Sequence, residues 1–255
     1  MKLFQHQDPG EKDFSSVGLT DIGLVRKTNQ DCLVEAGNLV GVADGMGGHQ
    51  GGEVASADAR DAIAAFAEGK TPGPILLRQG IEEANRAVLA HAKEDPELNG
   101  MGTTLTVLWV GETAVYLGHV GDSRCYRWRD GKLERMSEDH SMVMEMVRLG
   151  LLTEEQAAVH PMRNVITRAV GVDESVEVDT ATFPRQKGDL WLLCSDGLHG
   201  MIDDDTISEI LHGAASDREA AESLVEAAIT AGGRDNVTVM LLRDERGAAK
   251  GDGQS

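Results

Sequence analysis

The sequence predicts an α+β fold in which two antiparallel β-sheets stack face to face and helices cover their outer surfaces. Two observations predict this arrangement. Apolar residues recur with helical periodicity in two pairs of segments, and each pair lies between groups of short strand-like segments. This order is typical of stacked antiparallel sheets rather than of alternating strand–helix–strand units. The chain has 255 residues, of which 41% are hydrophobic, so it can build one large domain with a sizeable core.

The predicted strands are short runs of apolar and β-branched residues bounded by turn residues. Asp130-Gly131 separates two of them and is a strong signal for a β-hairpin. In chain order, strands are predicted at residues 15–24, 39–43, 103–110, 114–120, 125–129, 132–136, 176–183, 190–194 and 237–242.

The predicted helices form two pairs, 53–68 with 75–93 and 204–212 with 217–231. In the second of these helices the apolar residues fall on one face, namely Leu77, Ile81, Ala84, Val88 and Ala92. Ser216 and Glu219 have the spacing of a capping box at the start of the last helix.

Residues 141–162 interrupt the strand pattern with short helical pieces, one of which begins with a second capping box at Thr153 and Gln156. We expect a small helical flap beside the sandwich, with its methionines (Met142, Met144 and Met146) packed onto the sandwich. Residues 1–13 and 244–255 are expected to be tails, the second of them disordered, because they contain little to bury. The predicted folded domain is therefore 14–243.

The charge balance limits the classes of partner that the protein can bind. Twenty-four basic and 43 acidic side chains give a formal net charge of −19, which disfavours nucleic acid and anionic membranes as partners. No apolar run approaches membrane-spanning length, and the N-terminal residues lack an apolar secretory core, so a cytoplasmic protein is expected. We also expect a monomer. The three cysteines (Cys32, Cys125 and Cys194) are far apart and are expected to be buried as small hydrophobic residues.

One segment, 40–56, combines a strand end with a glycine-rich loop. Four apolar or small residues lead to Asp44, and five glycines follow between Gly45 and Gly52. Glycine brings bare backbone close to a ligand, and a carboxylate among exposed carbonyls suits a hard divalent cation. The same residues also fit a flexible turn in which Asp44 starts a helix, and the segment alone leaves both interpretations open.

Other aspartates occupy similar positions. Asp122, Asp196 and Asp235 each lie where a predicted strand meets a loop, and Asp31 follows the first strand. Neighbouring carboxylates raise each other's pKa, so a cluster of them is unfavourable unless cations neutralise it. Any one aspartate fits a turn; four at strand–loop junctions indicate a metal site.

Several segments, in order, resemble the motifs of the metal-dependent type 2C protein serine/threonine phosphatases. They are R-K-T-N-Q-D (26–31), V-A-D-G-M-G-G-H-Q-G-G-E (42–53), M-G-T-T-L (101–105), V-G-D-S-R (120–124), D-H-S (139–141), N-V-I-T-R-A-V-G (164–171), L-C-S-D-G-L (193–198) and D-N-V-T-V (235–239). The resemblance covers roughly residues 15–243 and implies a four-layer αββα sandwich of two antiparallel sheets flanked by helix pairs, with the flap as an insertion.

The resemblance also implies two tightly bound Mn²⁺ or Mg²⁺ ions and a third, weaker one. Asp44 would bridge the two ions, the Gly45 carbonyl would bind one, and Asp196 and Asp235 would hold the other. Asp122 matches the position for the third metal. Asp31 would contact the metals through water.

Arg26 matches the arginine that grips the substrate phosphate, a task suited to its forked guanidinium. Such a metal pair activates water for in-line attack on phosphorus, so no covalent phosphoenzyme is required. Accordingly, the sequence has no G-x-S-x-G elbow at Ser195, since Leu193 stands where its first glycine would be.

Two positions depart from eukaryotic relatives. Met46 replaces the histidine proposed there as general acid, as is common in bacterial members, and His49 follows three residues later. His49 has either a proton-transfer role or a structural role in the glycine loop. Gln30 replaces a glutamate before Asp31.

The resulting functional prediction is a bacterial-type phosphatase acting on phosphoserine and phosphothreonine in proteins and opposing a cognate serine/threonine kinase. The alternative is a non-catalytic signalling or interaction module, against which the presence of Arg26, Asp44, Asp196 and Asp235 speaks. A two-metal phosphodiesterase or nuclease is disfavoured by the acidic composition.

Overall fold

The computed structural model describes residues 2–6, 13–47 and 51–246. Its strands form two sheets, in which every pairing is antiparallel. The first sheet has the order β1 (Lys2–His6), β2 (Phe14–Asp21), β12 (Val237–Asp244), β11 (Leu190–Cys194), β8 (Arg124–Arg129) and β9 (Lys132–Arg135). The second has the order β10 (Asp179–Pro184), β7 (Ala114–Val120), β6 (Leu105–Val110), β4 (Leu39–Met46) and β3 (Asp31–Ala36), and β5 (Gly102–Thr103) pairs with β4.

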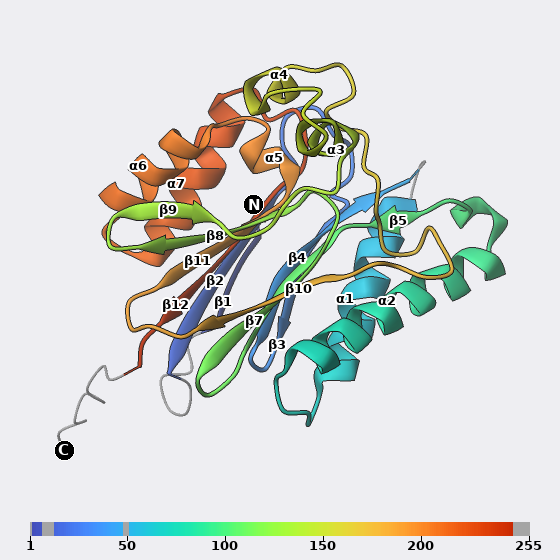
Figure 1. The fold of residues 1–255 in the computed structure, drawn as a ribbon, viewed down its shortest axis with the longest axis horizontal. Coiled ribbons are helices and arrows are strands. Elements are labelled where there is room, and N and C mark those ends of the chain that lie inside the picture. The colour runs from blue at the N-terminus through green and yellow to red at the C-terminus, as the bar shows by residue number, and fades with distance from the viewer. Residues whose placement is uncertain (1, 7–12, 48–50, 247–255) are drawn as a thin grey trace.

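Helices cover the outer face of each sheet (Figure 1). On the second sheet lie α1 (Gly51–Ala67) and α2 (Pro74–Glu94), with the 3₁₀ turn η1 (Pro96–Leu98) after them. On the first lie α6 (Asp204–Gly213) and α7 (Asp217–Thr230), preceded by the short α5 (Asp196–His199). The predicted four-layer αββα sandwich is thus confirmed, and so is the helical flap, which contains α3 (Met142–Arg148) and α4 (Glu154–Ala158).

Three apolar layers hold the sandwich together, one between the sheets and one beneath each helix pair. Strand β11 shows why its sequence is a continuous apolar run. Leu190, Leu192 and Cys194 face the α6–α7 layer, whereas Trp191 and Leu193 face the other sheet. Side chains alternate across a strand, so a strand covered on both faces needs apolar residues at every position.

Several local predictions are confirmed. Asp130 and Gly131 have positive φ values of 51° and 76°, as the tight β8–β9 hairpin requires. Thr153 and Gln156 form a reciprocal capping box at α4. Cys125 and Cys194 are buried as predicted, whereas Cys32 is only half-buried because it lies on the edge strand β3, and all three are free.

The structure differs from the prediction at both ends of the domain. Residues 2–6 are predicted as part of a tail, but they form β1 at the edge of the first sheet. The buried guanidinium of Arg185 bonds to Asp13 at 2.9 Å and to Asp244 at 2.7 Å, so these two residues belong to the folded part. Local sequence patterns do not reveal that one arginine binds residues at both ends of the domain.

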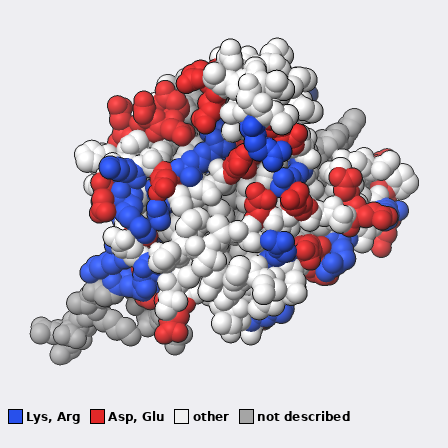
Figure 2. All heavy atoms as spheres, viewed as in Figure 1, with Lys and Arg blue, Asp and Glu red and all other residues white. Residues whose placement is uncertain are grey.

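Among the described residues, no helix has the length and apolarity needed to cross a membrane. Figure 2 shows acidic side chains over α6, and basic and acidic side chains together over the β8–β9 hairpin. The arginines of the hairpin are paired: Arg127 bonds to Glu134, and Arg129 bonds to Asp189 with both Nε and Nη2 at 2.6 Å. The charges of these two arginines are therefore balanced within the protein.

Candidate metal centre

Five aspartates reach one end of the sandwich from both sheets. Asp31 begins β3 and pairs in register with Asp44 of β4, and Asp122 follows β7 in the same sheet. Asp196 follows β11 at the start of α5, and Asp235 precedes β12 in the other sheet. A cavity of about 290 Å³ is lined by four of them, Asp44, Asp122, Asp196 and Asp235, together with Arg26 and Gly45 among others, whereas Asp31 lies behind its wall. The structure thus brings the predicted residues together, and their roles as ligands remain predictions.

Two threonines hold the main chain of Asp44. The amide of Asp44 donates to Thr104 Oγ1 at 2.9 Å, and the Asp44 carbonyl accepts from the Thr104 amide at 2.8 Å and from Thr103 Oγ1 at 2.9 Å. Thr104 in turn bonds to Ser123 at 2.8 Å, beside Asp122. Both threonines lie in the M-G-T-T-L motif, but their role in fixing the backbone appears only when β4 and the 102–104 segment come together.

Gly45 occupies a position that admits no side chain. A Cβ atom there would lie 1.9 Å from the Gly52 carbonyl oxygen and 2.6 Å from that of Gln30. The Gly45 amide donates to the Gln30 carbonyl at 3.1 Å. The backbone of Gly45 is therefore clamped between the start of α1 and the residue before Asp31, which is the close approach that only glycine permits.

Asp31 is held by the serine that precedes Asp196. Ser195 Oγ donates to Asp31 Oδ2 at 2.7 Å and accepts from the Thr238 amide at 3.0 Å. Ser195 is fully buried, and its hydroxyl links Asp31 of one sheet to the main chain of the other. It is therefore a structural residue and not a nucleophile. This agrees with the absence of a nucleophile elbow at this position.

The carboxylates destabilise each other's charged form. Burial, followed by the charges of Asp31 and Asp196, raises the pKa of Asp44 well above its ordinary value. Burial and the charge of Asp235 raise the pKa of Asp196 to about 6, although hydrogen bonding with Asp44 opposes the shift.

The two flanking aspartates behave in the same way. Burial raises the pKa of Asp31 to about 7, even though the hydroxyls of Thr238 and Ser195 stabilise the carboxylate. Burial, together with the charges of Asp196 and Asp139, raises the pKa of Asp122 to about 8. Full ionisation of the cluster is therefore unfavourable, because burial and the neighbouring carboxylates both favour the protonated forms.

Arg26 supplies the positive charge that lies closest to the cluster. Its Nη2 atom is 2.5 Å from Asp235 Oδ2, and the two side chains are 49% and 31% exposed. This hydrogen bond is the main cause that raises the pKa of Arg26. In this structure Arg26 is paired with Asp235, and its role in gripping phosphate stays a prediction.

The donor set fits divalent cations. Within the described ranges, no three acidic, histidine or cysteine side chains are already arranged as a metal cage. The carboxylates nevertheless border one cavity, and their raised pKa values show a deficit of positive charge that one arginine does not remove. Oxygen ligands with excess negative charge are what Mg²⁺ and Mn²⁺ prefer.

A second group of charges adjoins the cluster and is balanced. Arg124 grips Asp139 through Nε and Nη2, at 3.0 and 2.8 Å, and Arg135 contacts the same carboxylate. Burial alone would raise the pKa of Asp139, but the hydrogen bonds and charges of the two arginines lower it. The D-H-S motif contains Asp139, yet the sequence does not reveal its two partners.

The proton-transfer candidates are only partly described. His49 lies outside the described residues, so its predicted role stays a prediction. Met46 lines the cavity, as does Gln30. His199 places Nε2 3.1 Å from the Asp122 carbonyl, and burial lowers its pKa to about 3, so it adds no positive charge near neutral pH.

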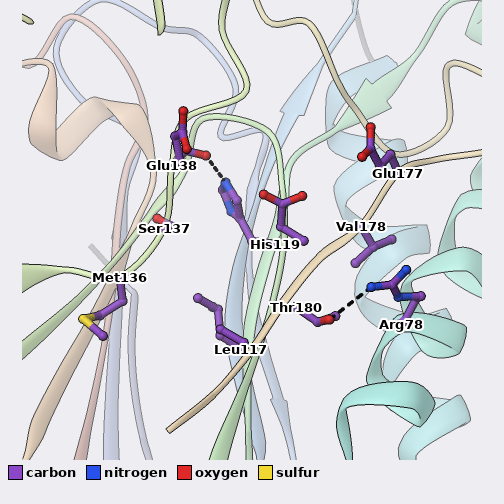
Figure 3. A pocket seen from close by; sticks show the side chains of 11 residues that line it. Arg78, Leu117, His119, Met136, Ser137, Glu138, Glu177, Val178 and Thr180 are labelled. Atoms are coloured by element: carbon purple, nitrogen blue, oxygen red, sulfur yellow. Dashed lines mark hydrogen bonds between the residues drawn. The ribbon is translucent and has the colours of Figure 1, made fainter. Parts of the chain in front are cut away.

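A separate cavity of about 430 Å³ lies against α2, β7, β10 and residues 136–138 (Figure 3). His119 bonds through Nε2 to the Glu138 carbonyl at 2.9 Å, and Arg78 bonds to Thr180 at 3.2 Å. None of the five aspartates lines it. It is therefore distinct from the acidic site.

Together, the fold and the site define an α+β protein with a carboxylate-rich centre suited to divalent cations. A family model described as protein phosphatase 2C matches residues 26–229, and the chain belongs to this family. The serine/threonine phosphatase stp of Listeria monocytogenes is 40% identical over 234 residues, which cover 88% of this chain and 93% of that protein.

Solved structures show the same similarity. The Mycobacterium tuberculosis serine/threonine phosphatase PstP/Ppp has a TM-score of 0.87 and 38% identity, covering 91% of this chain and 99% of that chain. The catalytic domain of the serine/threonine protein phosphatase PstP in complex with two manganese ions has a TM-score of 0.83 and 37% identity, covering 90% of this chain and 97% of that chain.

Proposed function

We propose that this protein is a metal-dependent phosphatase that hydrolyses phosphoserine and phosphothreonine in proteins. The observation that carries the proposal is the cluster of buried aspartates with raised pKa values beside the cationic rim residue Arg26. Family membership supports it, as does the manganese-bound structure of the similar PstP domain.

The residues would divide the work as follows. Asp44, the Gly45 carbonyl, Asp196 and Asp235 would hold two Mn²⁺ or Mg²⁺ ions, which supply activated water and offset the charge of the phosphoryl group. Asp122, with Asp196, would hold a third and weaker ion. Asp31 would contact the metals through water, with Ser195 fixing its carboxylate.

Arg26 would bind two phosphate oxygens through its guanidinium fork. In the structure its Nη2 is bonded to Asp235, so a phosphate that binds through Nη2 would displace this contact. Neutralising Asp235 weakens the hold on Arg26 and leaves the guanidinium available for phosphate. Phosphate binding would therefore depend on neutralisation of the acidic cluster.

The biological setting proposed is bacterial signalling in which the phosphatase opposes a cognate serine/threonine kinase. A cytoplasmic location is supported by Cys32, Cys125 and Cys194, which are all free, as expected in a reducing compartment. The monomeric state stays a prediction.

The decisive experiment measures hydrolysis of a phosphothreonine peptide and of a small aryl phosphate with Mn²⁺ and with a chelator. We expect activity only with metal, and a loss of at least about 10³-fold in kcat/KM in Asp44→Asn and in Asp235→Asn, because each removes a charged ligand.

Asp203→Asn is the matched control. Asp203 caps α6 by accepting from the Thr206 amide at 2.9 Å, and asparagine caps helices equally well, so activity should be unchanged. Metal-independent activity in the wild type, or full activity in Asp44→Asn, would refute the two-metal mechanism. A wild type that hydrolyses neither substrate with Mn²⁺ would favour the non-catalytic alternative.

A further inference from the structure

The side chain of Asn236 ties down the loop that carries Arg26. Asn236 is only 3% exposed and directly follows Asp235. Its Oδ1 accepts from the Gln30 amide at 2.9 Å, and its Nδ2 donates to the carbonyls of Ile22 and Thr28, both at 3.0 Å. A carboxamide has two N–H donors and one carbonyl acceptor, so every polar group of this side chain is used.

These contacts close the base of loop 22–30, which connects β2 to β3. Ile22 lies four residues before Arg26 and Thr28 two residues after it, so the amide grips the chain on both sides of the arginine. The intervening Leu24 and Val25 are 68% and 65% exposed, and Arg26 is also exposed. Asn236 therefore holds both arms of a loop whose side chains are largely exposed, and the bond from the Leu24 amide to the Gly233 carbonyl at 2.7 Å supports the same loop.

The same residue also touches the acidic site. The backbone amide of Asn236 donates to Asp235 Oδ1 at 2.8 Å, and Arg26 reaches Asp235 from the other side. Asn236 thus contacts both the base of the loop that carries Arg26 and the aspartate that Arg26 binds. The sequence places Asn236 in D-N-V-T-V, where it is indistinguishable from an ordinary turn residue before a strand.

We propose that Asn236 is a positioning residue that holds Arg26 at the rim of the aspartate cluster and thereby sets the affinity for the phosphoryl group of the substrate. The proposal rests on the phosphatase function proposed above. Without the amide, loop 22–30 samples other conformations, and the apparent affinity falls in proportion to the fraction of molecules that present Arg26 correctly. The backbone contact from residue 236 to Asp235 survives a side-chain substitution.

The first test compares the kinetics of Asn236→Ala and Asn236→Asp with the wild type, using an aryl phosphate and saturating Mn²⁺. We expect KM to rise roughly tenfold with kcat within about threefold, because the arginine contributes binding energy that is lost before the chemical step. Asn236→Asp keeps an oxygen that can accept from the Gln30 amide, and it replaces the alanine variant in this test if that variant fails to fold.

Asn85→Ala is the matched control. Asn85 is 1% exposed and also ties a loop, accepting from the Gly171 amide at 2.7 Å and donating to the Asp173 carbonyl at 2.9 Å. We expect it to lower the melting temperature without raising KM. Equal KM values in the wild type and both Asn236 variants would overturn the proposal.

A double-mutant cycle then asks whether Asn236 acts through Arg26. If it does, Asn236→Ala should raise KM by less than about twofold in an Arg26→Ala background, since neighbouring residues that act as a unit are not additive. A further tenfold rise in that background would contradict the proposal.

Amide hydrogen exchange of the metal-free protein gives a readout that does not depend on catalysis. The Gln30 amide should exchange about tenfold or more faster in Asn236→Ala and at the wild-type rate in Asn85→Ala. Unchanged Gln30 exchange would overturn the proposal. An inactive wild type would instead refute the phosphatase function, and the exchange result would still decide whether Asn236 holds the loop.

Discussion

Two groups of buried aspartates lie beside one cavity of about 560 Å³ beneath the flap, yet their electrostatics are opposite. Asp139 is held by Arg124 and Arg135, and its pKa is lowered. Asp122 and Asp196 have raised pKa values of about 8 and 6. All three side chains are aspartate carboxyls, and burial acts on each of them in the same direction.

The difference lies in the counter-charges. Arg124 and Arg135 compensate the charge of Asp139, so this group stabilises the fold without an added cation. The cluster around Asp44 has five carboxyl groups and Arg26 as its close cation, so it is stable only with protons or added cations. Chains tolerate such an uncompensated cluster where function requires it, and this distinguishes a ligand site from a structural ion pair.

The largest expected effect comes from neutralising one aspartate of each group in the metal-free protein. Asp139→Asn should destabilise the fold by about 3 kcal/mol, because it leaves the guanidinium charges of Arg124 and Arg135 uncompensated. Asp44→Asn should leave stability unchanged or raise it by about 1 kcal/mol, because it removes like-charge repulsion.

Chemical denaturation in the presence of a chelator measures both changes. The comparison fails if the two substitutions destabilise the metal-free protein equally, since that would mean that the Asp44 cluster is already neutralised within the fold.

The second prediction concerns the pH dependence of the free energy of unfolding without metal. The folded-state pKa values of Asp196, Asp31 and Asp122 are about 6, 7 and 8, above the unfolded value of about 3.9. The folded state then binds more protons than the unfolded state, so stability is highest below the unfolded pKa and falls as pH rises through the folded pKa values.

We expect a loss of roughly 2–4 kcal/mol between pH 5 and pH 8.5, measured by urea denaturation with a chelator. Asp122→Asn should flatten the profile. Asp139, whose pKa is lowered, works in the opposite sense and loses its contribution only as pH falls below about 4. Stability that rises from pH 5 to pH 8.5 would contradict the account.

Strands with both faces covered were readily predictable. The predicted strands 114–120 and 190–194 coincide with β7 and β11, because such strands are continuous apolar runs. Strand β3 was not predicted, because it is an edge strand in which only Asp31 and Val34 are buried. Helix α5 was also missed, since four residues carry no periodicity.

The sequence predicts the aspartates of the site, but not the residues that hold those aspartates and Arg26 in place. Asp44, Asp122, Asp196 and Asp235 each stand beside a strand that the sequence predicts, which is a local pattern, whereas Asp31 begins the strand β3 that it does not predict. The contact between Arg26 and Asp235 joins residues 209 positions apart, and the contacts of Asn236 with Ile22 and Thr28 are comparably distant in sequence. These contacts follow from the pairing of β2 with β12, in which Val237 lies opposite Asp21, and no local sequence pattern reveals that pairing.

Calorimetric titration of the metal-free protein with Mn²⁺ at neutral pH tests the central claim that the uncompensated cluster, and not its balanced neighbour, is the cation site. We predict two tightly bound ions in the wild type and in Asp122→Ala, and loss of tight binding in Asp44→Asn. Asp139→Asn, at a temperature where it is folded, should keep both ions. Tight binding that survives Asp44→Asn, or that disappears in Asp139→Asn while the protein remains folded, would contradict the account.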